Sequence, residues 1–382
     1  MRALATLLIA LLALALAAPP SPAAPPPELS AGQAQGFTAA LTPHAFSFPL
    51  DHGPHPDFRH EWWYVTGNLE GPAGERFGFE LTFFRFALAP PPRAPAPQGS
   101  AWRAREIYMG HFAITDVAHG RFEFAQKLSR AALDLAGAKA PPLFVWIDDN
   151  WSLAAGNPGS DTSRGSAAPW RLRAAHSDYA IELTLLPQTA PVLNGERGLS
   201  RKASAPEDAS YYYSLPRLEV HGRLERSGEP IPVRGVAWFD HEWGSGGLGA
   251  NESGWDWFGL DLEDGSALMF YALRERSGGR DPHSAGTWIG SGAEAQALAN
   301  EAVSIEVLDH WTNAKGTRYP SLWRVRVPAL DLELLVRPVL ADQELLTTPP
   351  YWEGAVDARG TRKGVAVGGR GYVELVGYAQ ER

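Results

Sequence analysis

A His-Glu-Trp triplet occurs twice in this chain, once at His60 and once at His241. The first lies in RHEWWYVTGNLEG and the second in FDHEWGSGG, so each histidine precedes a glutamate, Glu61 or Glu242, and a tryptophan. Imidazole and carboxyl groups exchange protons near neutral pH, and apolar surroundings tune them for acid–base catalysis. The two triplets therefore predict proton-transfer chemistry in an aromatic environment.

The second triplet is predicted to lie on a β-strand, whose side chains alternate between two faces. Asp240 and Glu242 then share one face, and His241 and Trp243 share the other. In a structural interpretation, which stays open, His60 and His241 only bind backbone groups at strand ends. The candidates for acid–base catalysis are His60, Glu61, Asp240, His241 and Glu242.

Residues that would carry other familiar chemistries are missing. The sequence has no Gly-x-Ser-x-Gly nucleophile motif, no phosphate-binding loop, no dinucleotide fingerprint and no cysteine. Neither triplet is followed by the second histidine of a zinc-peptidase motif. His44, His52, His55 and His60 lie close together in the sequence, but their spacing matches no standard metal set. We therefore expect neither a metal ion nor a cofactor.

Aromatic side chains near the first triplet are candidates for ligand contact. Trp62 and Trp63 are neighbours on one predicted strand, so they point to opposite faces, and at least one of them belongs to a core or a domain contact. The predicted ligand-binding residues are Trp62, Tyr64, Arg85, Trp243, Trp257 and Tyr271.

Arg85 is an unusual member of this set. In RFGFELTFFRFAL it falls on the same face as Phe77 and Phe83, at the end of the predicted strand. From there it could cap a barrel by pairing with Glu61 or Glu80, which we favour over contact with a substrate.

The sequence predicts an all-β protein. Short runs rich in Val, Phe, Tyr, Trp and Leu alternate with Gly, Pro, Asp and Asn, as in YAIELTLLP (179–187), VRGVAWFD (233–240) and ALMFYALR (267–274). The proline-rich stretch LAPPPRAPAPQGS (88–100) cannot lie inside a sheet and is expected to connect strands.

The chain is predicted to contain two related β-domains, residues 45–245 and 250–382. Residues 62–64 (WWY) and 255–257 (WDW) begin similar stretches, and GSGGLGANESG (244–254) resembles a connector between the halves. Each half must close or sandwich its sheet to avoid bare edges, and a barrel of about eight strands could hold one small ligand.

The amino-terminal sequence predicts export. Arg2 precedes an apolar run from Leu4 to Ala18, followed by small residues and prolines, which is typical of a signal peptide spanning residues 1–23. No later apolar run is long enough to cross a bilayer. The net charge of −9 argues against nucleic acid and anionic membrane partners. We expect a soluble secreted or periplasmic protein.

Several aromatic-rich stretches resemble the carotenoid 1,2-hydratase/AttH-like family of secreted lipocalin-related proteins. They are HEWWYVTGNLEG, FGFELTFFR, YYYSLPRLEVHG, WFDHEWGSG, WDWFGLDLEDGSALMFYALR, YWEGAVDARG and GRGYVELVGY, and they span residues 55–378 in one order. The resemblance implies two lipocalin-like β-barrel domains in tandem and an apolar, isoprenoid- or lipid-like ligand. It also implies possible partnership with ABC-transporter permease components, because some members are encoded beside them.

The resemblance also implies roles for individual residues. The hydratase branch carries His-x-Trp, matched here by His241 and Trp243, which would then line the pocket. That branch is expected to carry Tyr-x-Asp on a later strand, but here Tyr271 is followed by Ala272 and Leu273. At this position the chain departs from the pattern that the resemblance implies for carotenoid hydration. The remaining candidate proton donors are Asp240, Glu61 and Asp256.

Two classes of function stay open from the sequence. One is an exported hydratase or hydrolase that acts on an apolar molecule by acid–base chemistry. The other is a carrier that binds a hydrophobic ligand without changing it and exchanges it with an ABC transporter. A purely structural envelope protein would leave the histidine and carboxylate clusters without a purpose. Glu353 and Glu374 are expected to be structural or pocket-rim groups of the second domain.

Overall fold

The structure, a computed structural model, describes residues 35–92, 100, 102–156 and 168–379. The expected signal peptide, residues 1–23, lies outside these ranges. Within them, no helix is long and apolar enough to cross a membrane. The helices of the described chain are short 3₁₀ turns, η2 (Leu50–His52), η3 (Asn300–Ala302) and η4 (Pro328–Leu330).

Most of the described chain forms antiparallel β-strands, which confirms the predicted all-β class. Residues of alternating polarity produce these strands, since side chains on a strand point alternately to its two faces. In β8, for example, Trp170, Leu172 and Ala174 are buried whereas Arg171 and Arg173 are exposed. Such strands are stable only when a sheet curls around its apolar face.

Strands β1 to β13 form one sheet in the order β4-β3-β2-β1-β13-β12-β9-β8-β7-β6-β5, with β10 and β11 paired to β12. Its strands are β1 (His60–Glu70), β2 (Arg76–Ala87), β3 (Glu106–Asp116), β4 (Arg121–Arg130), β5 (Ala136–Lys139), β6 (Phe144–Ile147), β7 (Trp151–Ala154), β8 (Trp170–His176), β9 (Tyr179–Pro187), β10 (Val192–Leu193), β11 (Leu199–Arg201), β12 (Ala209–Arg226) and β13 (Glu229–Gly244).

Strands β14 to β23 form the second sheet in the order β17-β16-β15-β14-β23-β22-β20-β19-β18, with β21 paired to β22. Its strands are β14 (Glu252–Leu262), β15 (Ala267–Glu275), β16 (Ala285–Ile289), β17 (Ala295–Leu298), β18 (Ser304–Thr312), β19 (Arg318–Val327), β20 (Leu332–Pro338), β21 (Glu344–Leu345), β22 (Tyr351–Arg362) and β23 (Val365–Val376).

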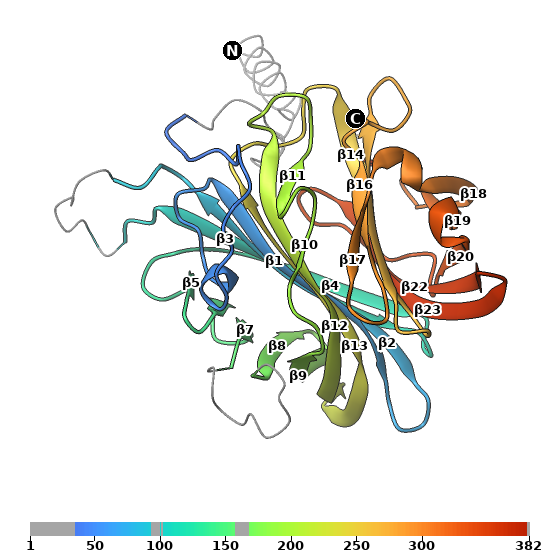
Figure 1. The fold of residues 1–382 in the computed structure, drawn as a ribbon. Helices are drawn as coiled ribbons and strands as arrows, with labels where there is room; N and C mark the ends of the chain where they lie inside the picture. The colour runs from blue at the N-terminus through green and yellow to red at the C-terminus, as the bar shows by residue number, and fades with distance from the viewer. Residues whose placement is uncertain (1–34, 93–99, 101, 157–167, 380–382) are drawn as a thin grey trace, which may run out of the picture.

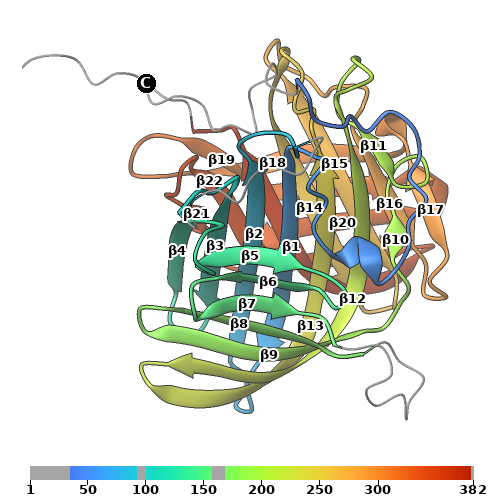
Figure 2. The same cartoon turned by 90° about the vertical axis from the view of Figure 1, so that its left-hand side faces the viewer.

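The first sheet curls into a barrel that brings its end strands β4 and β5 into contact (Figure 2). Its interior is filled by large apolar side chains, among them Trp63, Phe79, Trp151, Leu172 and Phe239. The N-terminal barrel is therefore a packed core rather than an open cup.

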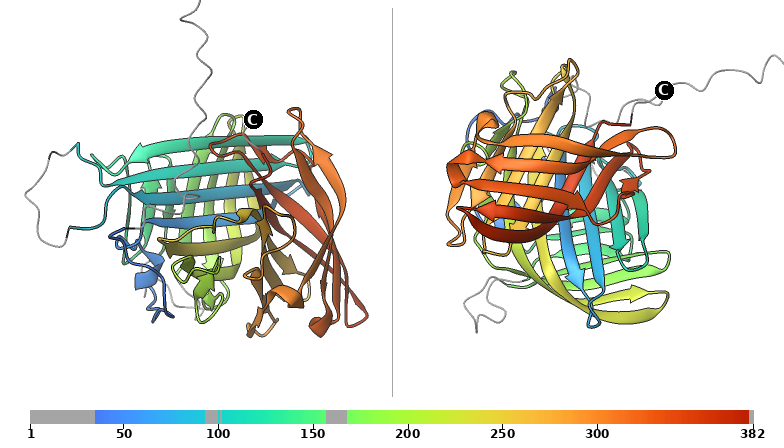
Figure 3. Two further views of the ribbon diagram at one scale, coloured as in Figure 1. Left: turned by 90° about the horizontal axis from the view of Figure 1, so that it is seen from above. Right: turned by 90° about the vertical axis from the view of Figure 1, so that its right-hand side faces the viewer.

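The second sheet curls in the same manner, as the right-hand view of Figure 3 shows. Phe258, Trp323, Val336, Trp352 and Leu375 are buried on its inner face. The two near-closed sheets confirm the expected tandem of lipocalin-like barrels.

The barrels meet through the outer faces of their central strands (Figure 1). Strands β1, β2 and β12 of the first sheet contact β23, β22 and β14 of the second. A buried aromatic cluster fills this interface and includes Tyr64, Tyr212, Trp238, Trp257 and Tyr372. The central strands are consequently buried on both faces, one in a barrel and one between the barrels.

Polar contacts also join the barrels. Arg76 pairs with Asp357 at 2.6 Å, and the Thr115 hydroxyl donates to Gln343 at 2.7 Å. The chain passes from one sheet to the other between Gly244 and Glu252. The domain limits 45–245 and 250–382 themselves stay a prediction.

Gly78 of the first barrel lies in close contact with the second barrel. A Cβ atom at this position would lie 2.7 Å from the Ala355 Cβ and 2.5 Å from the Tyr372 hydroxyl, both in the other barrel. We expect Gly78→Ala to lower the free energy of unfolding by about 1–3 kcal/mol, as overpacking does. Chemical denaturation of the single variant and of the Gly78→Ala/Ala355→Gly double variant tests this. The double variant should recover part of the loss, and an unchanged single variant would contradict the tight contact.

Candidate functional site

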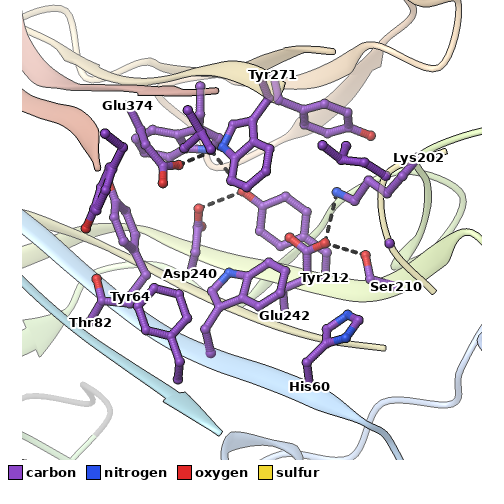
Figure 4. Close-up of a pocket in the computed structure, with 18 of the residues that line it drawn as sticks. His60, Tyr64, Thr82, Lys202, Ser210, Tyr212, Asp240, Glu242, Tyr271 and Glu374 are labelled. Carbon is purple, nitrogen blue, oxygen red and sulfur yellow. Dashed lines mark hydrogen bonds and ion pairs between the residues drawn. The ribbon is translucent and has the colours of Figure 1, made fainter. Parts of the chain in front are cut away.

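An apolar pocket lies between the two barrels (Figure 4). Its outline of about 1300 Å³ includes open solvent at its mouth. Both sheets contribute to its walls. Its apolar lining comprises Trp62, Phe84, Phe86, Met109, Leu248, Trp255, Trp257, Leu273 and Val376.

Strand alternation determines which residues reach this pocket. Strands β1 and β13 pair in register, so that Trp62 lies opposite Glu242 and Tyr64 lies opposite Asp240. These four side chains share the outer face of the sheet and line the pocket. The predicted separation of Asp240 and Glu242 from His241 is thus present in the structure.

Asp240 lies on the N-terminal wall, held by three donors. The Tyr212 and Ser214 hydroxyls and the Trp238 indole N–H donate to its carboxyl group at 2.6, 2.5 and 2.6 Å. Burial raises the pKa of Asp240 to about 7, although these hydrogen bonds act in the opposite direction. Asp240 can therefore exchange a proton near neutral pH.

Glu242 lies beside Asp240 on the same face but in a different electrostatic setting. Lys202 forms an ion pair with it at 2.9 Å, and the Ser210 hydroxyl donates to the same oxygen. The Lys202 ammonium also lies 4.3 Å from the Tyr271 ring centroid, a cation–π distance. Burial alone would lower the pKa of Lys202, but Glu242 raises it above its ordinary value. Glu242 is thus the ion-pair partner of Lys202 in the pocket wall.

Glu374 lies on the opposite wall, on β23. The Trp255 indole N–H donates to one of its oxygens at 2.9 Å. Burial raises the pKa of Glu374 to about 8, so the group is protonated at neutral pH. Trp257 pairs with Glu374 on one side and with Tyr271 on the other, which places all three in one row across β23, β14 and β15.

Two further carboxyl groups meet across the interface in a reciprocal arrangement. Glu80 of the first barrel accepts a hydrogen bond from Tyr351 of the second, and Glu353 of the second accepts one from Tyr64 of the first, at 3.0 and 2.8 Å. Within the described chain, one oxygen of each glutamate is buried without a partner. Burial raises the pKa of Glu80 to about 7 and, together with Glu80 itself, that of Glu353 well above its ordinary range.

A second polar constellation lies inside the N-terminal barrel, around Glu61 and Arg85. The Arg85 Nε donates to Glu61 at 2.8 Å, and its terminal nitrogens bind Glu106 and the carbonyl oxygens of His55 and Phe58. Both side chains are fully buried. Of the two expected partners of Arg85, it is therefore Glu61 that forms the ion pair.

Two histidines complete this constellation. His55 Nδ1 and His241 Nε2 lie 2.7 and 2.9 Å from the same Glu61 oxygen. Burial by itself would raise the pKa of Glu61, but Arg85 and His55 hold it well below its ordinary range. Among the described residues, His55, Glu61 and His241 are the group that could hold a metal ion, with ligand atoms within 4.8 Å of one another.

The structure divides the predicted site residues between these two places. Residues facing the pocket are His60, Trp62, Tyr64, Asp240, Glu242, Trp257 and Tyr271. Residues facing the barrel interior are Glu61, Arg85, His241 and Trp243. Strand alternation separates the two sets by one sheet, so the His-Glu neighbours of each triplet cannot act on one ligand together.

Burial also affects His60. It lowers the pKa of His60 to about 3, so this pocket histidine is neutral at physiological pH. Its ring stacks near Trp62, with 5.9 Å between the centroids. Asp256, considered as an alternative acid, is bound by Arg274 and Tyr378 and does not line the pocket.

Some pocket residues could not be identified from the sequence. Lys202 lies in a loop segment without a recognisable motif, and His111 lies in an apolar strand. Glu80 could have been identified from the sequence, because it is a carboxylate in the middle of the aromatic strand β2. Leu273, at the position expected to hold an aspartate, does line the pocket, but as an apolar residue.

The structure thus belongs to the class of proteins built from two lipocalin-like barrels, here with an aromatic pocket between them. Residues 39–378 match the AttH-like family, and the chain belongs to that family. This confirms the family resemblance seen in the sequence.

Known proteins similar to this chain include both solved structures and a fungal enzyme. The AttH structure from Nitrosomonas europaea is 36% identical, covers 90% of this chain and all of its own, and superposes with a TM-score of 0.77. Kievitone hydratase from Nectria haematococca shares the fold at 15% identity over 90% of this chain and 99% of its own, with a TM-score of 0.64. The dehydratase asqC of Emericella nidulans is 28% identical over 236 residues, which span 58% of this chain and 65% of the relative.

The buried carboxyl groups predict a pH-dependent stability. The pKa of Glu80 is about 7 in the folded protein, against 4.5 ordinarily, so the folded state binds more protons between these values. Its contribution to stability is therefore complete below pH 4.5 and is lost as the pH rises through 7. When the pH is raised from 5 to 8, we expect the free energy of unfolding to fall less in Glu80→Gln than in the wild type, by on the order of 2 kcal/mol.

Denaturant unfolding at both pH values measures this difference. Glu229→Gln is the matched control, because Glu229 is exposed and should leave the wild-type slope unchanged. Equal pH slopes in all three proteins would show that Glu80 is not held in its protonated form.

Proposed function

We propose that this protein is a hydro-lyase that adds water to, or removes it from, a carbon–carbon double bond of an apolar, isoprenoid-like molecule in the pocket between the barrels. One observation carries the proposal. The two walls of an aromatic pocket present carboxyl groups in different surroundings. Glu374 is desolvated and protonated at neutral pH, whereas Glu242 is paired with the ammonium group of Lys202. Such a division of environments assigns an acid and a base.

Glu374 is the proposed acid. It holds its proton at neutral pH and lies beside the indoles of Trp255 and Trp257. It also shares a row with Tyr271, on the wall where Leu273 replaces the expected aspartate. Glu374 can thus supply, from the neighbouring strand, the acidic group that position 273 lacks.

Glu242 is the proposed base. In hydration, Glu374 transfers its proton to one alkene carbon, and the π electrons form the new C–H bond, leaving a carbocation on the adjacent carbon. A water molecule forms the C–O bond with this carbon and loses a proton to Glu242. Dehydration is the reverse. The faces of Trp257 and Tyr271 can stabilise the intermediate cation.

Relatives support this reaction class. One similar protein is named a dehydratase, and another of the same fold is named kievitone hydratase. Both names describe the gain or loss of water. The substrate class of this chain is proposed from the aromatic lining of its own pocket.

The test is turnover of kievitone and of an acyclic carotenoid in ¹⁸O-labelled water, followed by mass spectrometry. We expect a labelled hydrate from at least one probe, and a fall in kcat of about 10²–10⁴-fold in Glu374→Gln, the usual contribution of a positioned acid. The wild-type rate should fall as the pH rises through about 8, since the acid must be protonated.

Glu263→Gln provides the control, because Glu263 is exposed and lies outside the pocket. A fully active Glu374→Gln variant would show that Glu374 is not the acid. Absence of product from probes that nevertheless bind would favour the second candidate below.

The second candidate is a carrier for a hydrophobic ligand, favoured by one observation. The hydratase branch is expected to hold its acid at position 273, but here that pocket position is occupied by the apolar residue Leu273. In this proposal the exported protein exchanges its ligand with an ABC-transporter permease in the cell envelope. Native mass spectrometry of the purified protein would then reveal an unchanged apolar compound, bound reversibly at one copy per chain.

A further inference from the structure

We propose that the N-terminal barrel binds one divalent transition-metal ion of the zinc type, with His55 Nδ1, Glu61 Oε1 and His241 Nε2 as ligands. This site is separate from the pocket, because none of the three residues lines it. The proposal is therefore independent of the hydro-lyase assignment, and either can fail alone.

The ligand atoms are already arranged around a common point. His55 Nδ1 and His241 Nε2 lie 2.7 and 2.9 Å from the same Glu61 oxygen, and all three atoms lie within 4.8 Å of one another. A zinc ion binds such nitrogen and oxygen atoms at about 2.0–2.2 Å, so modest outward shifts make room for it. The ion would take the place of the direct contacts that the two rings make with the Glu61 carboxylate.

The opposite side of each imidazole is held as in known metal sites. His55 Nε2 faces Asp51 Oδ1 at 3.3 Å, and His241 Nδ1 faces the Asp51 carbonyl oxygen at 3.1 Å. An oxygen acceptor at the remote nitrogen directs the lone pair of the other nitrogen toward a metal. One residue, Asp51, thus orients both histidines.

Stacking fixes the planes of the two rings. The His55 ring lies parallel to the Trp243 indole, with 3.7 Å between centroids and an angle of 2°. The His241 ring stacks on Trp63 at 5.0 Å and 21°. The ligands are therefore held in place before any ion arrives, which lowers the entropic cost of binding it.

The charge balance also favours a dication. Two carboxylates, Glu61 and Glu106, pair with the single guanidinium of Arg85, and a third, Asp51, lies on the other side of His55. When both histidines are neutral, as metal ligands are, these four groups sum to two negative charges, and Glu106 among them is 25% exposed. Arg85 Nε binds the second Glu61 oxygen, Oε2, and so leaves Oε1 to the ion. A divalent cation would neutralise the cluster.

The folding role of such an ion follows from where its ligands originate. His55 lies in the segment before β1, whereas Glu61 and His241 lie on β1 and β13. The ion would fasten this amino-terminal segment to the two central strands of the barrel. Access is possible from the side of His55, whose side chain is 14% exposed.

The test uses the untagged full-length protein, stripped with a chelator and then supplied separately with Zn²⁺, Co²⁺ and Ni²⁺. We expect one tightly held ion per chain by elemental analysis, a higher Tm on binding, and a Co²⁺ absorption spectrum of nitrogen and oxygen ligands. His55→Ala should abolish stoichiometric binding. Asp51→Asn, which keeps all three ligands, should weaken it about 10–100-fold.

His60→Ala is the matched control, since His60 belongs to the same triplet as Glu61 but faces away from the barrel interior, into the pocket. It should retain the ion. Failure of the wild type to hold any of the three metals in stoichiometric amount overturns the proposal, as does equal binding by the wild type, His55→Ala and Asp51→Asn. The Asp51 variant keeps the proposal testable if His55→Ala does not fold.

Discussion

Burial of β1 and β13 on both faces is the constraint on which the rest of the molecule depends. One face of this strand pair fills the N-terminal barrel, and the other forms a wall between the barrels. Because side chains alternate along a strand, every consecutive pair of residues is divided between two different environments. The doubled His-Glu-Trp motif is the clearest case, since Glu61 and His241 turn inward while His60 and Glu242 turn outward.

The interface between the barrels contains buried carboxyl groups that lower its stability. Placing Glu80, Glu353 and Glu374 in an apolar interface carries a desolvation penalty, and their raised pKa values are its signature. An interface selected for stability alone would have apolar groups at these positions. Two of these groups, Glu80 and Glu374, line the aromatic pocket, where the proposed hydro-lyase reaction would use Glu374 for proton transfer.

Strands β1 and β14 share one local pattern, in which two aromatic residues that line the pocket flank a residue that does not. In β1, Trp63 points into its barrel between the pocket residues Trp62 and Tyr64. In β14, Asp256 takes the place of Trp63 between two tryptophans that line the pocket. The shared pattern places aromatic side chains from both barrels around one ligand space, so the pocket belongs to neither barrel by itself.

The sequence by itself determined the all-β class, the pair of barrels and the family, because alternating polarity and aromatic-rich strands are local properties. It also determined that Asp240 and Glu242 lie on the face opposite His241. It could not determine that Glu374 meets Glu242 across a pocket, or that His55 reaches His241, because these pairs come together only through the packing of distant strands. Lys202 has no local signal at all, since its role arises from its ion pair with Glu242. The sequence therefore determines which chemical groups are present. The tertiary structure determines which of these groups lie close together and how deeply each is buried, and burial sets the protonation state of each group.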